Sequence, residues 1–229
     1  MLRVEEKYRL TPADFHKVRE LIGAVMEMDR GRQYKISSLY FDDLYDTDLT
    51  ETVAGNPQRQ KMRVRIYDDS FSLIKLEVKN KWYSKIEKFS ELISYEDLQS
   101  LLQGKPIAWD EANSQNPRNA FNKRILTAGL RPKVIVTYER SAFCYDFGNT
   151  RITFDEIVRA SNRIELFGHA DLCYDYSEES FILEVKYDQF LPNFAVKLLN
   201  TVDMEQTSFS KYRLCREQYE LIKTGGLLE

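Results

Sequence analysis

Hydrophobic and polar residues alternate along most of the chain, which is the pattern of β-strands with one buried face. The alternation is clearest in KMRVRIYDDSFSLIKLEVKNK, residues 61–81, where two alternating segments flank a short turn. The same pattern predicts strands at residues 2–10, 36–43, 59–68, 72–81, 84–93, 132–147, 150–159, 168–176 and 180–188. We therefore expect a large antiparallel sheet or a closed barrel, because closure leaves no unpaired strand edges.

Helical signals are fewer. Thr11 and Pro12 open the segment TPADFHKVRELIGAV with an N-cap residue and a proline at the first helical position. Ser94 and Asp97 have the spacing of an approximate capping box. Further helices are expected near residues 116–129, 191–201 and 210–223. The predicted fold class is α+β, in one domain that covers residues 1–229.

The composition limits the classes of function. The 229 residues carry a net charge of -3, so a general affinity for nucleic acid is not indicated, and any anion site must come from a local gathering of cations. Cys144, Cys173 and Cys215 lie far apart without a CxxC spacing, which is typical of free thiols in a reducing compartment. His16 and His169 are the only histidines. A bound metal is therefore expected to be a hard ion held by carboxylates.

The sequence carries no signal for membrane insertion. Its first ten residues, MLRVEEKYRL, are too polar for a signal peptide, and no apolar run approaches the ~18 residues of a membrane span. A cytoplasmic location is expected.

The polar positions of residues 61–81 carry mostly charge of one sign. Lys61, Arg63 and Arg65 follow one another on the same side of one strand, and the next strand adds Lys75, Glu77, Lys79 and Lys81. An ordinary solvated sheet face is one interpretation. However, like charges in a row destabilise a sheet unless an anion compensates them. An anion site therefore predicts that Arg63→Ala and Arg65→Ala weaken anion binding and raise stability in phosphate-free buffer.

Single carboxylates recur among these cations. Glu5, Glu77 and Glu184 each lie on a strand whose neighbouring polar positions are basic, as Lys186 is beside Glu184. Cations that bind phosphate oxygens, together with a few carboxylates that bind a divalent ion, describe a site for a polyanion with its metal. Glu77 is interpreted equally well as a metal ligand or as an ion-pair partner of Arg65 and Lys79.

Eight short motifs carry a family resemblance. RVEEKY, SLYFDD, KMRVRIY, LEVKNK, YERSAF, RITFD, LEVK and FSKY occur in this order between residues 3 and 212. Together they resemble the VTC (vacuolar transporter chaperone) polyphosphate polymerase domain, a branch of the triphosphate tunnel metalloenzymes, which also include the CYTH-type triphosphatases and cyclases. The resemblance implies a closed antiparallel eight-stranded β-barrel with a charged lumen and several short flanking helices.

The resemblance also implies roles for individual residues. The lysine of FSKY, Lys211, is implied to be catalytic, with Ser210 contacting substrate beside it. The residues implied to bind ATP and polyphosphate are Lys7, Arg63, Arg65, Lys79, Lys88 or in its place Lys85, Arg140 and Arg151. The implied metal ligand is Glu184. The charge pattern adds Lys186 to the phosphate-binding residues and Glu5 and Glu77 to the metal ligands, and Asp155 is expected to balance Arg151.

One departure bears on the branch of the family. Arg3 stands where the CYTH branch has the first glutamate of its ExExK motif, which removes a metal ligand and favours a polymerase. No SPX-like domain or membrane segment accompanies the motifs, so a separate membrane protein is the expected partner if polymer crosses a membrane.

The function that follows is an enzyme that transfers the γ-phosphate of ATP to a growing polyphosphate chain with Mn²⁺ or Mg²⁺. Pyrophosphate or triphosphate is a further expected ligand. The anionic end of a phosphate chain needs no general base, which agrees with the lack of histidine in the motifs. Two alternatives stay open: a tunnel triphosphatase that hydrolyses inorganic or nucleoside triphosphate, and a non-catalytic polyphosphate-binding module.

Overall fold

The computed structural model describes residues 4–83 and 85–223, and it divides the chain into two compact units. Unit 1 comprises Met1–Lys35, Tyr138–Val158 and Glu178–Phe209. Unit 2 comprises Ile36–Thr137, Arg159–Ser177 and Ser210–Glu229. Strands β3 (Tyr34–Asp42), β7 (Arg131–Tyr145) and β8 (Thr150–Ser161) contribute residues to both units.

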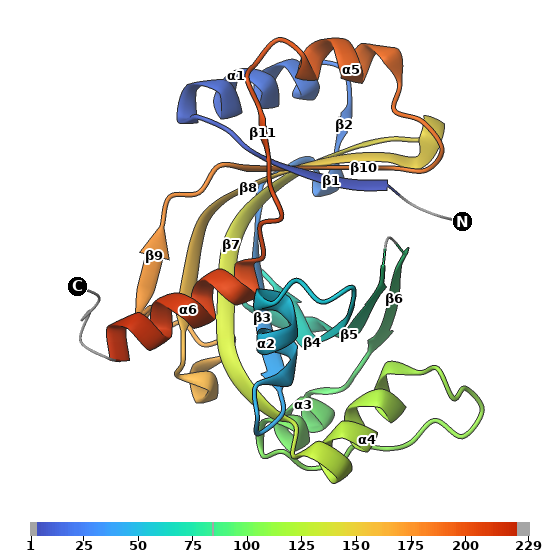
Figure 1. Cartoon of the computed structure of the whole chain (residues 1–229), viewed down its shortest axis with the longest axis vertical. Coiled ribbons are helices and arrows are strands. Elements are labelled where there is room, and N and C mark those ends of the chain that lie inside the picture. Colours follow the sequence, from blue (N-terminus) through green and yellow to red (C-terminus); the bar gives the residue numbers. More distant parts are fainter. Residues whose placement is uncertain (1–3, 84, 224–229) are drawn as a thin grey trace. The chain divides into compact units, whose positions relative to one another are not determined.

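Unit 1 is a sheet with two helices on one face. Its strands follow the order β11–β1–β10–β8–β7, and β2 pairs with β7. The remaining bounds are β1 (Val4–Arg9), β2 (Glu27–Met28), β10 (Ile182–Tyr187) and β11 (Glu205–Gln206), with 3-10 turns at Asp29–Gly31 and Phe147–Asn149. Helices α1 (Pro12–Gly23) and α5 (Asn193–Leu199) lie side by side over the sheet (Figure 1).

Local chemistry explains why α1 begins where it does. The Thr11 hydroxyl accepts a hydrogen bond from the backbone N–H of Asp14 at 3.2 Å, which satisfies one of the amide groups that a helix start leaves unpaired. Phe15, Val18 and Ile22 follow at helical spacing and are fully buried. Because they share one face, they pack against the apolar face of the sheet, where the Phe15 ring lies 5.3 Å from that of Phe154.

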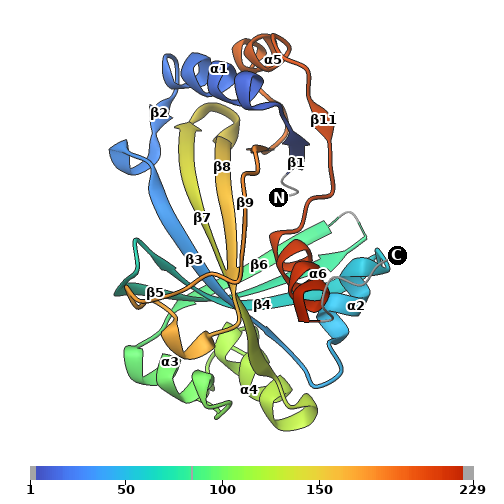
Figure 2. The same cartoon turned by 90° about the vertical axis from the view of Figure 1, so that its left-hand side faces the viewer.

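Unit 2 is built around strands β3–β4–β5–β6 and four helices. The bounds are β4 (Gln58–Tyr67), β5 (Ser70–Trp82), β6 (Lys85–Leu92), β9 (Tyr176–Glu178), α2 (Thr47–Val53), α3 (Tyr95–Leu102), α4 (Pro117–Ala128) and α6 (Lys211–Lys223), with a 3-10 turn at Ile164–Leu166. Figure 2 shows α3 and α4 on one side of these strands and α6 beside α2. The predicted capping box of Ser94 and Asp97 is confirmed at the start of α3.

The sheet of each unit has one apolar and one charged face. In unit 2, Arg63 lies opposite Glu77, whereas its neighbour Val64 lies opposite Leu76 in the core. In unit 1, Lys7 lies opposite Glu184, and the next pair, Tyr8 and Leu183, packs in the core. The period of two therefore sends every second side chain to the same face, as the alternation predicted.

The prediction of an antiparallel α+β fold is confirmed. Eight of the described strands have six or more residues, in agreement with the predicted number: β1, β3, β4, β5, β6, β7, β8 and β10. Among the described residues their order is a path from β11 to β6 and not a closed ring, because the outer edge of β1 pairs with β11.

Two local predictions differ from the structure. Residues 168–176 are turn and irregular chain up to the last residue, because Gly168, with a φ of +78°, continues the turn that begins at Ile164–Leu166. Helix α2 was not predicted, since its seven residues TDLTETV are too few and too polar to show a helical period. None of the helices in the described part of the chain is long and apolar enough to cross a membrane.

Candidate functional sites

Strands β4, β5 and β6 gather cations on one face of unit 2. Lys61 lies opposite Lys79, which lies opposite Lys88, and the next rung pairs Arg63 with Glu77. We call Lys61, Arg63, Arg65, Glu77, Lys79 and Lys88 the charged face of unit 2. It holds five cations and one carboxylate.

Glu77 lies at the centre of this face with only 2% of its side chain exposed. Its carboxylate is 2.6 Å from Arg63 Nε and 3.8 Å from Arg65 Nε, and it also contacts Lys88. Burial alone would raise the pKa of Glu77, but the three cations hold it well below the usual range. The structure shows Glu77 as an ion-pair partner of Arg63, Arg65 and Lys88, and its role as a metal ligand stays a prediction.

The structure separates Lys88 from Lys85, the two candidates for one phosphate-binding lysine. Lys88 lies opposite Lys79 on the charged face and contacts Glu77. Lys85 lies opposite Trp82, three residues from Lys88 along β6, so its side chain belongs to the other face of the sheet. Lys85 is therefore not brought together with the predicted phosphate-binding residues of unit 2.

The start of helix α6 lies beside this charged face. Ser210 caps the helix, since its hydroxyl accepts from the Arg213 backbone N–H at 3.3 Å. The same hydroxyl accepts from Lys61 Nζ at 2.7 Å. Lys211 is the first residue of α6. The hydrogen bond from Lys61 thus fixes the helix start that carries Lys211 against strand β4.

Sequence reasoning missed the residue that anchors this helix. Tyr212 is 1% exposed, and its hydroxyl donates to Asp42 Oδ2 at 2.7 Å. Its ring stacks on Tyr40 at 5.0 Å, and the Tyr40 hydroxyl accepts from Arg63 Nη1 at 2.9 Å. Tyr212 therefore links Lys211 to the charged face. The FSKY and SLYFDD motifs contain these tyrosines and Asp42, but sequence spacing does not show that the two motifs meet.

Unit 1 has a second charged face, on β1, β10, β8 and β7. We define it as Glu5, Lys7, Arg140, Arg151, Glu184 and Lys186. Glu184 is 3.7 Å from Lys7 and 3.2 Å from Lys186, and Glu5 is 3.7 Å from each of the same two lysines. The two carboxylates are thus neighbours that share their cationic partners.

This pair of carboxylates is the best place for a divalent ion in unit 1. Burial alone would raise the pKa of Glu184, but Lys186, Lys7 and Arg140 hold it well below its usual range, so it is ionised. Over the described ranges 4–83 and 85–223, no group of three or more His, Cys, Asp or Glu side chains is arranged to hold a metal. Two carboxylates suit an ion whose other ligands are phosphate oxygens and water, which is how Mg²⁺ is usually bound.

The two arginines of unit 1 have different partners. Arg140 binds Asp155 through two hydrogen bonds of 2.6 and 2.7 Å and lies 3.6 Å from Glu184. Arg151 pairs with Asp29 at 2.7 Å. The expectation that Asp155 balances Arg151 is therefore not met, because Asp155 forms its bidentate pair with Arg140. Arg3 lies outside the described residues.

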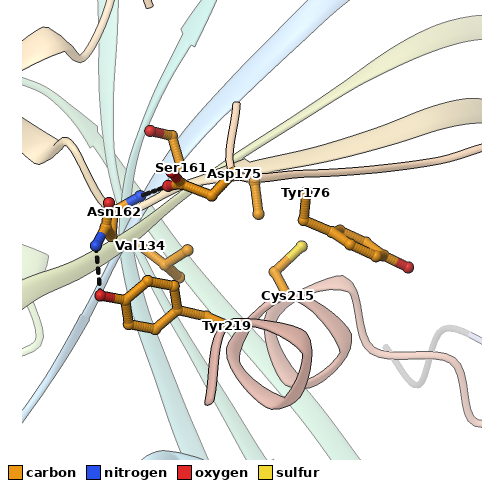
Figure 3. Close-up of a pocket in the computed structure, with 8 residues that line it drawn as sticks. Val134, Ser161, Asn162, Asp175, Tyr176, Cys215 and Tyr219 are labelled. Carbon is orange, nitrogen blue, oxygen red and sulfur yellow. Dashed lines mark hydrogen bonds between the residues drawn. The ribbon is translucent and has the colours of Figure 1, made fainter. Parts of the chain in front are cut away.

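A small pocket beside α6 is not a substrate site. Figure 3 shows Asn162 donating to the Tyr219 hydroxyl and, through its backbone, to Asp175 at 2.9 Å, with Cys215 facing the gap. The gap leaves no space for a water molecule and exposes only apolar surface. It is a packing defect under α6.

Solved structures of other proteins resemble this chain. A structure from Hippeastrum, named as a candidate adenylyl cyclase and described as having a dominant triphosphatase activity, is 14% identical, with 95% of this chain and 96% of that chain covered and a TM-score of 0.58. A protein from Bacillus halodurans named as a candidate adenylate cyclase is 10% identical, with 100% and 91% covered and a TM-score of 0.49. The first likeness shows a shared fold.

No curated protein sequence matches the chain. The VTC domain family, in contrast, matches residues 2–219, which include both charged faces and the start of α6. The chain therefore belongs to the VTC domain family.

Proposed function

We propose that this protein is a metal-dependent polyphosphate polymerase that transfers the γ-phosphate of ATP to the end of a polyphosphate chain. The observation that carries the proposal is the charged face of unit 2, where five cations surround one buried carboxylate. Like charges at this density need an anion, and a phosphate chain supplies one at regular spacing. The family match spans both units, which supports treating residues 1–229 as one functional domain.

Phosphate transfer requires alignment of the two reacting phosphate groups and neutralisation of their negative charge. A terminal oxygen of the polyphosphate chain attacks the γ-phosphorus of ATP, the bond from that phosphorus to the bridging oxygen breaks, and ADP leaves with the oxygen. Arg63 and Arg65 suit the binding of phosphate oxygens because a guanidinium group donates two parallel hydrogen bonds. Lys211 would stabilise charge on the transferred group, and no group has to remove a proton from the attacking oxygen.

Glu184 and Glu5 are the residues that would hold Mn²⁺ or Mg²⁺. When bound, the ion would supply neutralisation of the negative charge on the phosphates. Lys7, Lys186 and Arg140 already surround these carboxylates, so a phosphate group brought there meets cations as well.

The alternative with specific support is a triphosphatase, since the Hippeastrum structure of the same fold is described as having that activity. In that reaction water replaces the polyphosphate end as the nucleophile, and orthophosphate is released. Water needs activation, usually by a metal with several protein ligands. In unit 1, Glu5 and Glu184 lie beside the lysines, and Asp155 is held by Arg140 in a bidentate pair. Two available carboxylates suit the polymerase better, because its nucleophile is already anionic.

Incubation of the pure protein with ATP, Mn²⁺ and a short polyphosphate primer, followed by a polyphosphate gel, separates these functions. A ladder of longer polymer supports the polymerase. Release of orthophosphate without polymer supports the triphosphatase. Binding of polyphosphate without either product would reduce the protein to a binding module.

A further inference from the structure

Unit 2 contains a cleft of about 420 Å³ where β4 begins and β5 ends. Helix α2 contributes Glu51 to the lining, and the end of β5 contributes Trp82. None of the residues that line this cleft belongs to the charged face of unit 2.

Trp82 is the unusual member of this cleft. Half of its side chain, 52%, is exposed, and it lies opposite Gln58 at the end of the β4–β5 pairing. The chain beside it is held in place, because the Tyr83 backbone N–H donates to the carbonyl of Pro57 at 2.7 Å. A fixed, half-exposed indole in a cleft offers a flat surface on which a heterocyclic base can stack.

Polar groups around the indole suit the edge of such a base. The Asn80 amide oxygen accepts from Gln60 at 2.8 Å, so its amide nitrogen can donate to a ring nitrogen or a carbonyl oxygen. The Gln58 amide can donate and accept, and the Glu51 carboxylate can accept from an exocyclic amino group. Amides and carboxylates are the groups with which proteins read base edges.

Two cations of the cleft occupy strand positions on the same side as the charged face, whereas the indole lies on the opposite side, so the cleft reaches both sides at the ends of these strands. Arg59 lies opposite Lys81, one residue from the pair of Gln58 and Trp82, and both line the cleft. Two residues further along the same strands is the pair of Lys61 and Lys79. Each two-residue step along a strand covers about 6.6 Å, so the cations continue at short intervals from the cleft to the charged face.

We propose that this cleft binds the nucleoside part of a nucleoside triphosphate, with the base stacked on Trp82 and the phosphates directed to Arg59 and Lys81. The inference deepens the proposed function, on which it rests, by giving the base of the ATP donor a binding site. A base with an exocyclic amino group fits Glu51 best. Inorganic polyphosphate has no base and gains nothing from the cleft.

Tryptophan fluorescence tests the proposal because the chain has only two tryptophans. In a Trp109→Phe background Trp82 is the single tryptophan. ATP should then quench its emission saturably, whereas tripolyphosphate at saturating concentration should change it little. Trp82→Ala should weaken ATP binding about 10-fold, the scale of one lost stacking contact, and leave tripolyphosphate affinity within about 2-fold. Trp82→Phe should restore most of the ATP affinity.

Trp109→Ala is the matched control, since that side chain is 53% exposed and does not line the cleft. Equal effects of Trp82→Ala on ATP and tripolyphosphate, or no effect on either, would overturn the proposal. Both readouts are equilibrium binding, so they do not depend on turnover. Base-dependent ATP binding without polymer formation would support the nucleoside site and reject the polymerase. Polymer formation with unchanged ATP affinity in Trp82→Ala would support the polymerase and reject the nucleoside site.

Discussion

The two charged faces differ in how their cations are balanced. In unit 1 the four cations Lys7, Lys186, Arg140 and Arg151 are paired with four carboxylates, Glu5, Glu184, Asp155 and Asp29. In unit 2, Glu77 alone lies among Lys61, Arg63, Arg65, Lys79 and Lys88.

This difference indicates different tasks. A balanced face with adjacent carboxylates can accept a divalent ion at little electrostatic cost, whereas a face with excess positive charge is stabilised by a polyanion. We therefore expect changes in unit 1 to alter metal binding first and changes in unit 2 to alter phosphate binding and transfer first. A unit 1 variant that altered phosphate binding more than metal binding would contradict this division of tasks.

The largest effect is expected at the start of α6. Lys211→Ala should lower the rate of phosphate transfer at least ~100-fold, about 2.7 kcal/mol, because a group that acts on the transition state affects turnover more than substrate binding. The affinity for ATP should change much less. Lys211→Arg should recover part of the rate, since a guanidinium places its charge differently from an ammonium. The exposed Lys123 provides the control, and equal rates for both alanine variants would exclude Lys211 from catalysis.

The next effect tests the metal assignment in unit 1. Glu184→Gln should weaken Mn²⁺ binding in the presence of tripolyphosphate by about 10-fold or more, since one of two carboxylate ligands is lost. Metal-free tripolyphosphate binding should stay the same or strengthen, because an anion has left a group of cations. Isothermal titration measures both, with the exposed Glu179→Gln as control. Normal Mn²⁺ affinity in Glu184→Gln would move the metal to other ligands.

The structure reverses the stability expected for the arginine variants. Like-charge repulsion predicted that Arg63→Ala and Arg65→Ala raise stability, but both guanidinium groups lie within 4 Å of the buried Glu77 carboxylate. Removing either leaves a buried charge with less compensation, so we expect a loss of about 1–3 kcal/mol without phosphate. Thermal unfolding compares these variants with the exposed Arg163→Ala. A higher melting temperature in Arg63→Ala would show that repulsion outweighs the ion pairs.

A smaller effect is expected from the anchor of α6. Tyr212→Phe removes the hydrogen bond to the buried Asp42 and should lower stability by about 1–2 kcal/mol. If Tyr212 also positions Lys211, turnover should fall while the KM for ATP stays nearly constant. Tyr45→Phe is the control, because that side chain is 85% exposed. A stability loss with unchanged turnover would make Tyr212 a purely structural residue.

The smallest expected effect is a pH dependence in unit 2. Burial lowers the pKa of Lys88 from 10.5 to about 8, although Glu77 opposes the shift. Tripolyphosphate affinity should therefore fall as the pH rises from 7 to 9.5, and this dependence should be weaker in Lys88→Met. The unfolded chain holds this proton up to about pH 10.5, so the contribution of Lys88 to stability becomes more favourable between pH 8 and 10.5. Titration of binding against pH in both proteins tests the assignment.

Much of the fold could be predicted from the alternation of residues. Strands β4 and β5 were located within a few residues, because a sheet with one buried face imposes a period of two. The segment 168–176 was mistaken for a strand because its polar and apolar residues alternate by chance around a turn. Short elements such as α2 and β11 carry too few residues to show any period.

The site was predictable only where one strand carried the signal. The row Lys61, Arg63 and Arg65 was visible in the sequence because its residues share a strand. Glu77 could not be assigned, since its role depends on which cations the neighbouring strands place around it. The contact of Tyr212 with Asp42 joins residues 170 positions apart, and no local pattern encodes such a contact.

The most direct test of the account follows the γ-phosphate of ATP by ³¹P NMR in the presence of Mg²⁺, which is diamagnetic, and a tripolyphosphate primer. The account predicts that each ADP formed is matched by one new internal polyphosphate resonance, with no orthophosphate, and that Lys211→Ala abolishes both signals together. Formation of ADP and orthophosphate in equal amounts, with the primer unchanged in length, would contradict phosphate transfer to a polymer and establish hydrolysis.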